Sequence, residues 1–218
     1  MPKWVKFILA LLLLPACAGT ARTLWELARE CGGADVVLVP LLAGAGCWIA
    51  IYLLLPRPMW IYVFGHELTH ALWVWLFGGR VKRFRATANG GHIVTDKVNF
   101  LIALAPYFFP LYAALLVAVF GLGEALGDWA RFRVWFHLLL GAAYAFHVTL
   151  TAHVLKTRQS DITSQGYLFS AVVIFLGNAA VLLVALPLLT GAVPLSRALT
   201  RWALDVAALY RDLLPPAG

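Results

Sequence analysis

Long apolar blocks, each about the length of a membrane-spanning helix, constrain this chain more than any other feature. A helix needs about 20 predominantly apolar residues to cross the hydrocarbon core of a bilayer, so each block of that length predicts one span. Five blocks qualify, namely Val36–Leu55, Met59–Phe77, Phe100–Leu122, Val134–Leu155 and Leu168–Leu189. With a shorter N-terminal block, the sequence predicts an all-α integral membrane protein, a bundle of five or six transmembrane helices.

The composition supports a lipid bilayer as the surroundings of this chain. Hydrophobic residues make up 62% of the sequence and charged residues only 12%, whereas a soluble domain has about 25% charged residues. The net charge of +7 comes mainly from basic residues in short segments between the apolar blocks. That placement is typical of membrane topology signals rather than of a nucleic-acid surface, so no nucleic-acid partner is predicted.

Both ends of the chain differ from the apolar middle. Lys3 and Lys6 precede an apolar run, which fits either a cleaved signal peptide or a retained first helix. We therefore expect residues 1–34 to form this segment and an amphipathic linker, and residues 35–190 to form the polytopic core. Within the C-terminal segment 191–218, Pro194–Leu214 alternates apolar and charged positions, which predicts an amphipathic helix on the membrane surface.

The longest polar segment inside the chain predicts a β-hairpin. Within Arg80–Asn99, two extended runs, Val81–Ala88 and His92–Val98, are joined at Asn89-Gly90-Gly91. Asn-Gly between such runs is a hairpin signal. If the spans alternate, this segment and Lys156–Arg158 lie on one side with seven Lys or Arg, against three on the other. The excess predicts that this side is cytoplasmic.

His66 and His70 carry the clearest chemical signal in the sequence. They are four residues apart in an apolar block, so a helix places both imidazoles on one face, about one turn apart. Two such histidines can bind one Zn²⁺, and Glu67 can act as the general base towards a zinc-activated water. Because a charged residue inside a span is costly, it indicates a functional site.

A catalytic zinc needs a third protein ligand, and the sequence offers several. The candidates are Asp161, His92, His147, His153 and Asp96. Asp161 is preferred because the predicted topology returns it to the side towards which the motif helix runs, although an Asp there also suits the cap of the next helix.

Other polar positions near the motif could take part in the site. His147 shares a helical face with Tyr144 and Thr151 and could hydrogen-bond a metal ligand, or it could simply pack inside the bundle. Gly90 and Gly91 let a backbone approach closely, and His92 follows them, so these three residues are candidates for binding substrate.

These features resemble the site-2 proteases, intramembrane zinc metalloproteases that cut membrane-embedded proteins. The likeness is carried by His66-Glu67-Leu68-Thr69-His70, by the Gly-Gly-containing segment that follows and by a late Asp. It implies zinc ligands at His66, His70 and Asp161, a catalytic base at Glu67 and a membrane-associated β-hairpin that holds an extended substrate. It also implies membrane-spanning protein substrates. We expect a bacterial inner membrane, with the active site towards the cytoplasmic side that the basic segments indicate.

The chain departs from that family around the third ligand. The family usually places its Asp in an Asn-x-x-Pro-x-x-x-Leu-Asp-Gly motif, but no Leu-Asp-Gly occurs in this chain. An alternative interpretation is a catalytically inactive relative that acts as a membrane scaffold or binds a partner. The presence of Glu67 favours an active enzyme.

Overall fold

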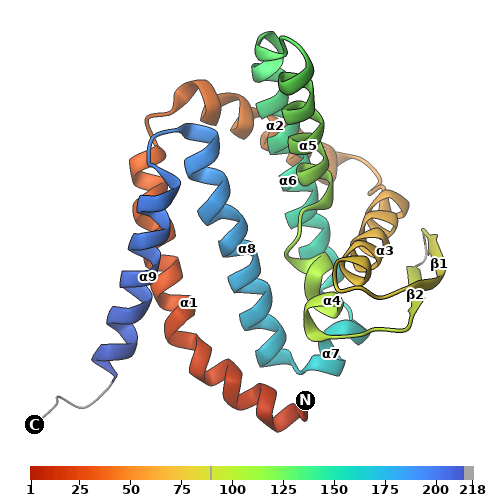
Figure 1. Cartoon of the computed structure of the whole chain (residues 1–218). Coiled ribbons are helices and arrows are strands. Elements are labelled where there is room, and N and C mark those ends of the chain that lie inside the picture. Colours follow the sequence, from red (N-terminus) through yellow and green to blue (C-terminus); the bar gives the residue numbers. More distant parts are fainter. Residues whose placement is uncertain (89, 214–218) are drawn as a thin grey trace, which may run out of the picture. The chain divides into compact units, whose positions relative to one another are not determined.

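The computed structural model describes residues 1–88 and 90–213 and is mostly helical (Figure 1). The elements in chain order are α1 (Lys3–Cys31), α2 (Asp35–Leu54), α3 (Met59–Leu76), β1 (Val81–Thr87), β2 (Gly90–Thr95), α4 (Phe100–Leu104), η1 (Ala105–Tyr107), α5 (Leu111–Leu126), η2 (Ala130–Phe132), α6 (Arg133–Val154), α7 (Ser160–Gln165), α8 (Tyr167–Thr190) and α9 (Leu195–Asp212). The helical fold class and the single small hairpin agree with the prediction.

Four helices in the described part of the chain are long and apolar enough to cross a membrane. They are α1, α2, the segment Ala130–Val154 and α8, and a fifth span is obtained if the bent pair of α4–η1 and α5 counts as one. The motif helix α3, expected as a span, is not among them. Its 18 residues include His66, Glu67 and His70, which lower its mean hydropathy.

The apolar block at 100–122 forms a bent pair of helices instead of one straight span. Phe100–Tyr107 and Leu111–Leu126 meet at 81°. Pro110 lies at this break, where a proline lacks the backbone N–H of a continuing helix and disfavours helical geometry at the residue before it. The expectation of one continuous helix was therefore wrong here.

The predicted β-hairpin is present, with a shifted boundary. β1 and β2 are antiparallel and form a two-stranded sheet, in which Thr87 pairs with Gly90 and Ala86 pairs with Gly91. Gly90, whose φ of 132° suits glycine, and Gly91 therefore belong to strand β2, not to the turn. Asn89 of the predicted turn lies outside the described residues.

The chain divides into two compact units. One comprises Met1–Asp35 with Ile162–Gly218, and the other comprises Val36–Asp161. In the first unit, α8 and α9 pack along α1 (Figure 1). Helix α9 approaches α1 closely at Gly19, where an added Cβ would lie 2.8 Å from the Val206 Cα.

Helix α9 matches the amphipathic helix predicted at 194–214, and two of its polar side chains bond α1. The Trp202 indole donates a hydrogen bond to the Thr20 hydroxyl over 2.8 Å, and the Thr23 hydroxyl donates to Asp205 over 2.7 Å. Part of the amphipathic pattern therefore serves contacts within this unit. A position of α9 on a membrane surface stays a prediction.

The second unit holds α3 between the hairpin and the apolar helices. β1 and β2 pack on α3, as do α4, η1 and α5. Tyr62 of α3 forms a buried cluster with Phe146 and Leu150 of α6. Helices α2 and α6 cross with their backbones in contact, because Gly44 and Gly141 each press against a carbonyl of the other helix. This packing fixes the helix that carries the histidine motif.

Candidate metal centre

His66 and His70 point to the same side of α3, as their spacing predicts. Their ring centroids lie 4.9 Å apart, and the Nε2 atom of each lies 3.5 Å from Oδ2 of Asp161. The side chains of His66 and His70 are only 12% and 9% exposed. The structure thus brings together the three residues that the sequence suggested as ligands.

Asp161 reaches this point from the first turn of α7. Burial raises the pKa of its carboxyl, but hydrogen bonding and charge interactions with His66 and His70 outweigh that effect and hold the pKa below its usual range. Asp161 is therefore a carboxylate at neutral pH, which is the form that binds a metal.

The spacing of the three donor atoms suits one metal ion. One ligand atom from each of His66, His70 and Asp161 can be chosen so that all lie within 4.8 Å of one another. Ligands at about 2.0–2.2 Å from a tetrahedral zinc stand about 3.3–3.6 Å apart, close to the 3.5 Å seen between Asp161 and each histidine. Two histidines and a carboxylate serve zinc and also non-haem iron.

The bent segment α4–η1 supplies hydrogen bonds behind two of these ligands. The Nδ1 atom of His70 lies 2.8 Å from the carbonyl oxygen of Ile102. Since a carbonyl only accepts, Nδ1 carries the proton, and Nε2 is left free to bind a metal. The Tyr107 hydroxyl donates to Oδ2 of Asp161 over 3.0 Å. Sequence reasoning missed both contacts, because the bend that creates them joins residues far apart in the chain.

Glu67 lies next to the ligands and is 6% exposed. It lines a cavity of about 560 Å³ together with His66, His70 and Asp161. Strand β2 passes directly over it, since a Cβ added to Gly91 would lie 2.6 Å from the Glu67 Cγ and 2.7 Å from the Arg85 carbonyl oxygen. Glycine at 91 is therefore required for this approach, which brings β2 against the Glu67 side chain.

The remaining predicted site residues fall into two places. Gly90, Gly91 and His92 line the same cavity as the donor group, but His92 is not part of that group. His147 lies on α6, buried, and lines a separate small cavity together with His66. The structure thus places the hairpin beside the donor group and His147 behind His66.

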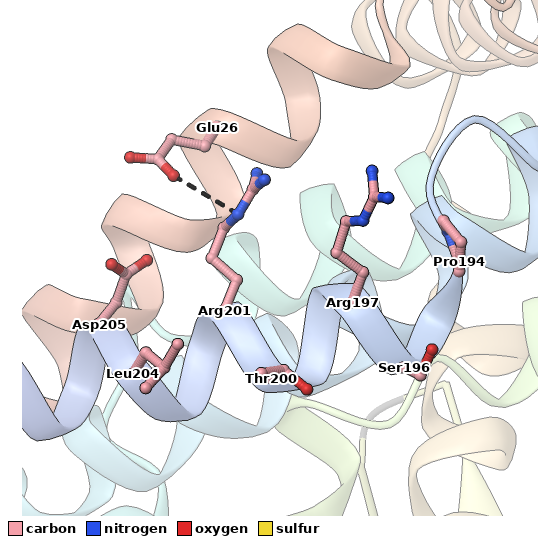
Figure 2. Close-up of a pocket in the computed structure, with 8 residues that line it drawn as sticks. All are labelled: Glu26, Pro194, Ser196, Arg197, Thr200, Arg201, Leu204 and Asp205. Atoms are coloured by element: carbon pink, nitrogen blue, oxygen red, sulfur yellow. Dashed lines mark ion pairs between the residues drawn. The ribbon is translucent and has the colours of Figure 1, made fainter.

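The unit formed by α1, α8 and α9 has a pocket of a different kind (Figure 2). Its cavity of about 660 Å³ lies between α1 and α9, and the guanidinium of Arg201 lies 3.8 Å from Glu26 and also contacts Glu30. Arg197 extends away from Glu26 in Figure 2. The acidic and basic side chains that line this pocket neutralise one another. Within the described residues, His66, His70 and Asp161 form the one metal-ligand cluster.

No family model, curated protein or solved structure matches this chain. The likeness to the site-2 proteases thus rests on the motif and its surroundings.

Proposed function

We propose that this protein is an intramembrane zinc metalloprotease that hydrolyses peptide bonds of membrane-embedded proteins. The observation that carries the proposal is the convergence of His66, His70 and Asp161 with Glu67 beside them in one cavity. Four apolar helices that could span a membrane provide the setting.

The neighbourhood of the donor group favours hydrolysis over the redox chemistry of non-haem iron. Glu67 follows His66 directly and lines the same cavity, where a carboxylate can accept a proton from water and pass it to the leaving nitrogen. When bound, zinc supplies a Lewis acid that polarises the scissile carbonyl and makes water more acidic. Ile102 and Tyr107 hold His70 and Asp161 in their orientations.

The hairpin offers a way to bind an extended substrate. β2 belongs to a two-stranded sheet and lines the cavity through Gly90, Gly91 and His92. A substrate strand could add to the sheet through backbone hydrogen bonds, which would place its amide near Glu67. Such a substrate would be a membrane-spanning segment that unwinds locally. In this proposal the protein is multi-pass in a bacterial inner membrane, with the site towards the cytoplasm because the basic segments flank it.

The test is cleavage of a model transmembrane substrate by the full chain in detergent, with zinc content measured on the same samples. The wild type is expected to cleave and to hold one zinc. Glu67→Gln should retain zinc and lose about 10²–10⁴-fold in rate, the usual contribution of a general base. Asp161→Ala should lose both the bound zinc and the cleavage activity.

Arg197→Ala serves as the control, since that guanidinium lies in the other unit. Equal rates for Glu67→Gln and the wild type would refute the mechanism. A wild type that binds zinc and cleaves no membrane substrate would favour the inactive scaffold instead.

A further inference from the structure

Two buried histidine nitrogens near the donor group have no hydrogen-bond partner among the described residues. They are Nδ1 of His66 and Nε2 of His147. His66 lies on α3 and His147 on α6, and both residues line one small cavity. A buried polar atom of this kind is normally paired with protein or with an ordered water.

The size of this cavity matches one water molecule. About 20 Å³ is open to the centre of a water-sized sphere, and about 10–15 Å³ by this measure is enough to hold a water. The cavity is too small for a substrate side chain or a second metal ion with its ligands. Its occupant is therefore set by the polar groups that line it.

Two hydroxyls complete the surroundings of such a water. Thr69 and Tyr112 also line the cavity. The Thr69 hydroxyl donates to the carbonyl of Gly65 over 2.8 Å, and the Tyr112 hydroxyl donates to the carbonyl of Ile61 over 2.6 Å. With their protons already committed, both hydroxyl oxygens can accept a hydrogen bond. The cavity therefore offers a water one donor, the His66 Nδ1–H, and three acceptors, of which a water can use two. These three bonds lie within the two to four that a buried water needs.

We propose that one buried water joins Nδ1 of His66 to Nε2 of His147, which makes His147 a positioning residue for the ligand His66. The Nδ1–H of His66 donates to the water, and the water donates to His147. The His66 Nε2, 3.5 Å from Asp161, is then unprotonated and available to a metal. This inference rests on the proposed metal site.

The arrangement gives both histidine ligands equivalent support. His70 is held directly by the Ile102 carbonyl, and His66 would be held by His147 through the water. Because a metal-bound histidine almost always donates its other N–H to an acceptor, the direct contact at His70 leaves His66 as the ligand that still requires one. His147 is the residue that can supply it.

The experiment measures the zinc affinity of the full chain in detergent by competition with a chelator. His147→Leu should weaken zinc binding by about 10–100-fold, the usual loss when such a partner is removed. His147→Gln, whose amide can still hydrogen-bond the water, should retain most of the wild-type zinc affinity. His137→Leu is the matched control, because His137 lies on the same helix, is equally buried and also has an unpaired nitrogen, but does not line the cavity.

A second measurement separates this inference from the proposed function. The ¹⁵N shifts of His66 in the metal-free chain should report one tautomer, with the proton on Nδ1, in the wild type and a mixture in His147→Leu. A wild type that binds no zinc would refute the proposed metal centre, and the tautomer would still test the role of His147. Unchanged zinc affinity and an unchanged tautomer in His147→Leu would overturn the inference.

Discussion

Both compact units contain acidic side chains beside basic or imidazole groups, but the two arrangements are opposite in kind. In the unit of α1, α8 and α9, Arg201 pairs with Glu26 (Figure 2) and with Glu30. Arg22 pairs with Glu26 and Asp205. Each carboxylate there meets a guanidinium of opposite charge. In the unit of residues 36–161, three donor groups point at a single place, and further hydrogen bonds orient two of them, His70 and Asp161.

This difference separates a structural network from a binding site. In such surface ion pairs each charge already has a partner of opposite sign. Each pair contributes little to folding stability, typically about 0–1 kcal/mol. Donor atoms that converge on one point in a buried setting are costly to assemble unless a ligand is bound there. The comparison therefore supports the proposed metal centre around α3 and is consistent with a packing role for the charges between α1 and α9.

The largest expected difference is between the two aspartates that represent these arrangements. Asp161→Ala should abolish zinc binding by the purified chain, because it removes one of three ligands. Asp205→Ala should leave the zinc content unchanged, because Asp205 accepts its hydrogen bond from Thr23 in the other unit. Elemental analysis measures the zinc content of both variants. Loss of zinc in both variants, or in neither, would contradict the distinction drawn between the two units.

A smaller effect, on the cleavage rate, is expected at Gly91, where β2 contacts Glu67. Gly91→Ala forces Glu67 or the strand to move, since the new Cβ would lie 2.6 Å from the Glu67 Cγ. A displacement of about 1 Å at a reacting group can cost about 10²-fold in rate, so cleavage should fall by about that factor while zinc is retained.

Gly46→Ala is the matched control for this substitution, because nothing lies within 4 Å of its added Cβ. Its cleavage rate should equal that of the wild type. A Gly91→Ala protein that cleaves at the wild-type rate would show that the close approach of β2 to Glu67 has no role in the reaction.

The smallest effect concerns a single hydroxyl behind a ligand. Tyr107→Phe removes the hydrogen bond to Asp161 and should weaken zinc affinity by about 10–100-fold. Tyr210→Phe removes a comparable hydroxyl, which donates to the carbonyl of Leu12 over 2.6 Å in the other unit, and should leave zinc affinity unchanged. Competition with a chelator measures the zinc affinity of both variants. Equal zinc affinities in the two variants would show that the Tyr107 hydroxyl has no role at the metal site.

Much of the helical framework could be predicted from the sequence, because long apolar blocks determine helix length. The blocks at Val36–Leu55 and Val134–Leu155 correspond within one residue at each end to α2 and α6. Pro110 breaks the block at 100–122, and the proline itself was visible in the sequence. Hydropathy alone therefore missed a bend that backbone chemistry explains.

The donor group could be predicted in part, for a similar reason. The spacing of His66 and His70 places both imidazoles on one helical face, and topology brought Asp161 near them. The support from Tyr107 and Ile102 could not be predicted, because it depends on the bend of α4–η1 against α3. Likewise, the boundary of β2 at Gly90 depends on pairing with Thr87, which the Asn-Gly signal does not fix.

The central claim is that Glu67 acts as a base beside a metal held by His66, His70 and Asp161. The most direct measurement is the cleavage rate of zinc-loaded Glu67→Gln on a transmembrane substrate, relative to zinc-loaded wild type. We predict one zinc per chain in both proteins and a rate lower by about 10²–10⁴-fold in the variant. Equal rates at equal zinc content would contradict the account.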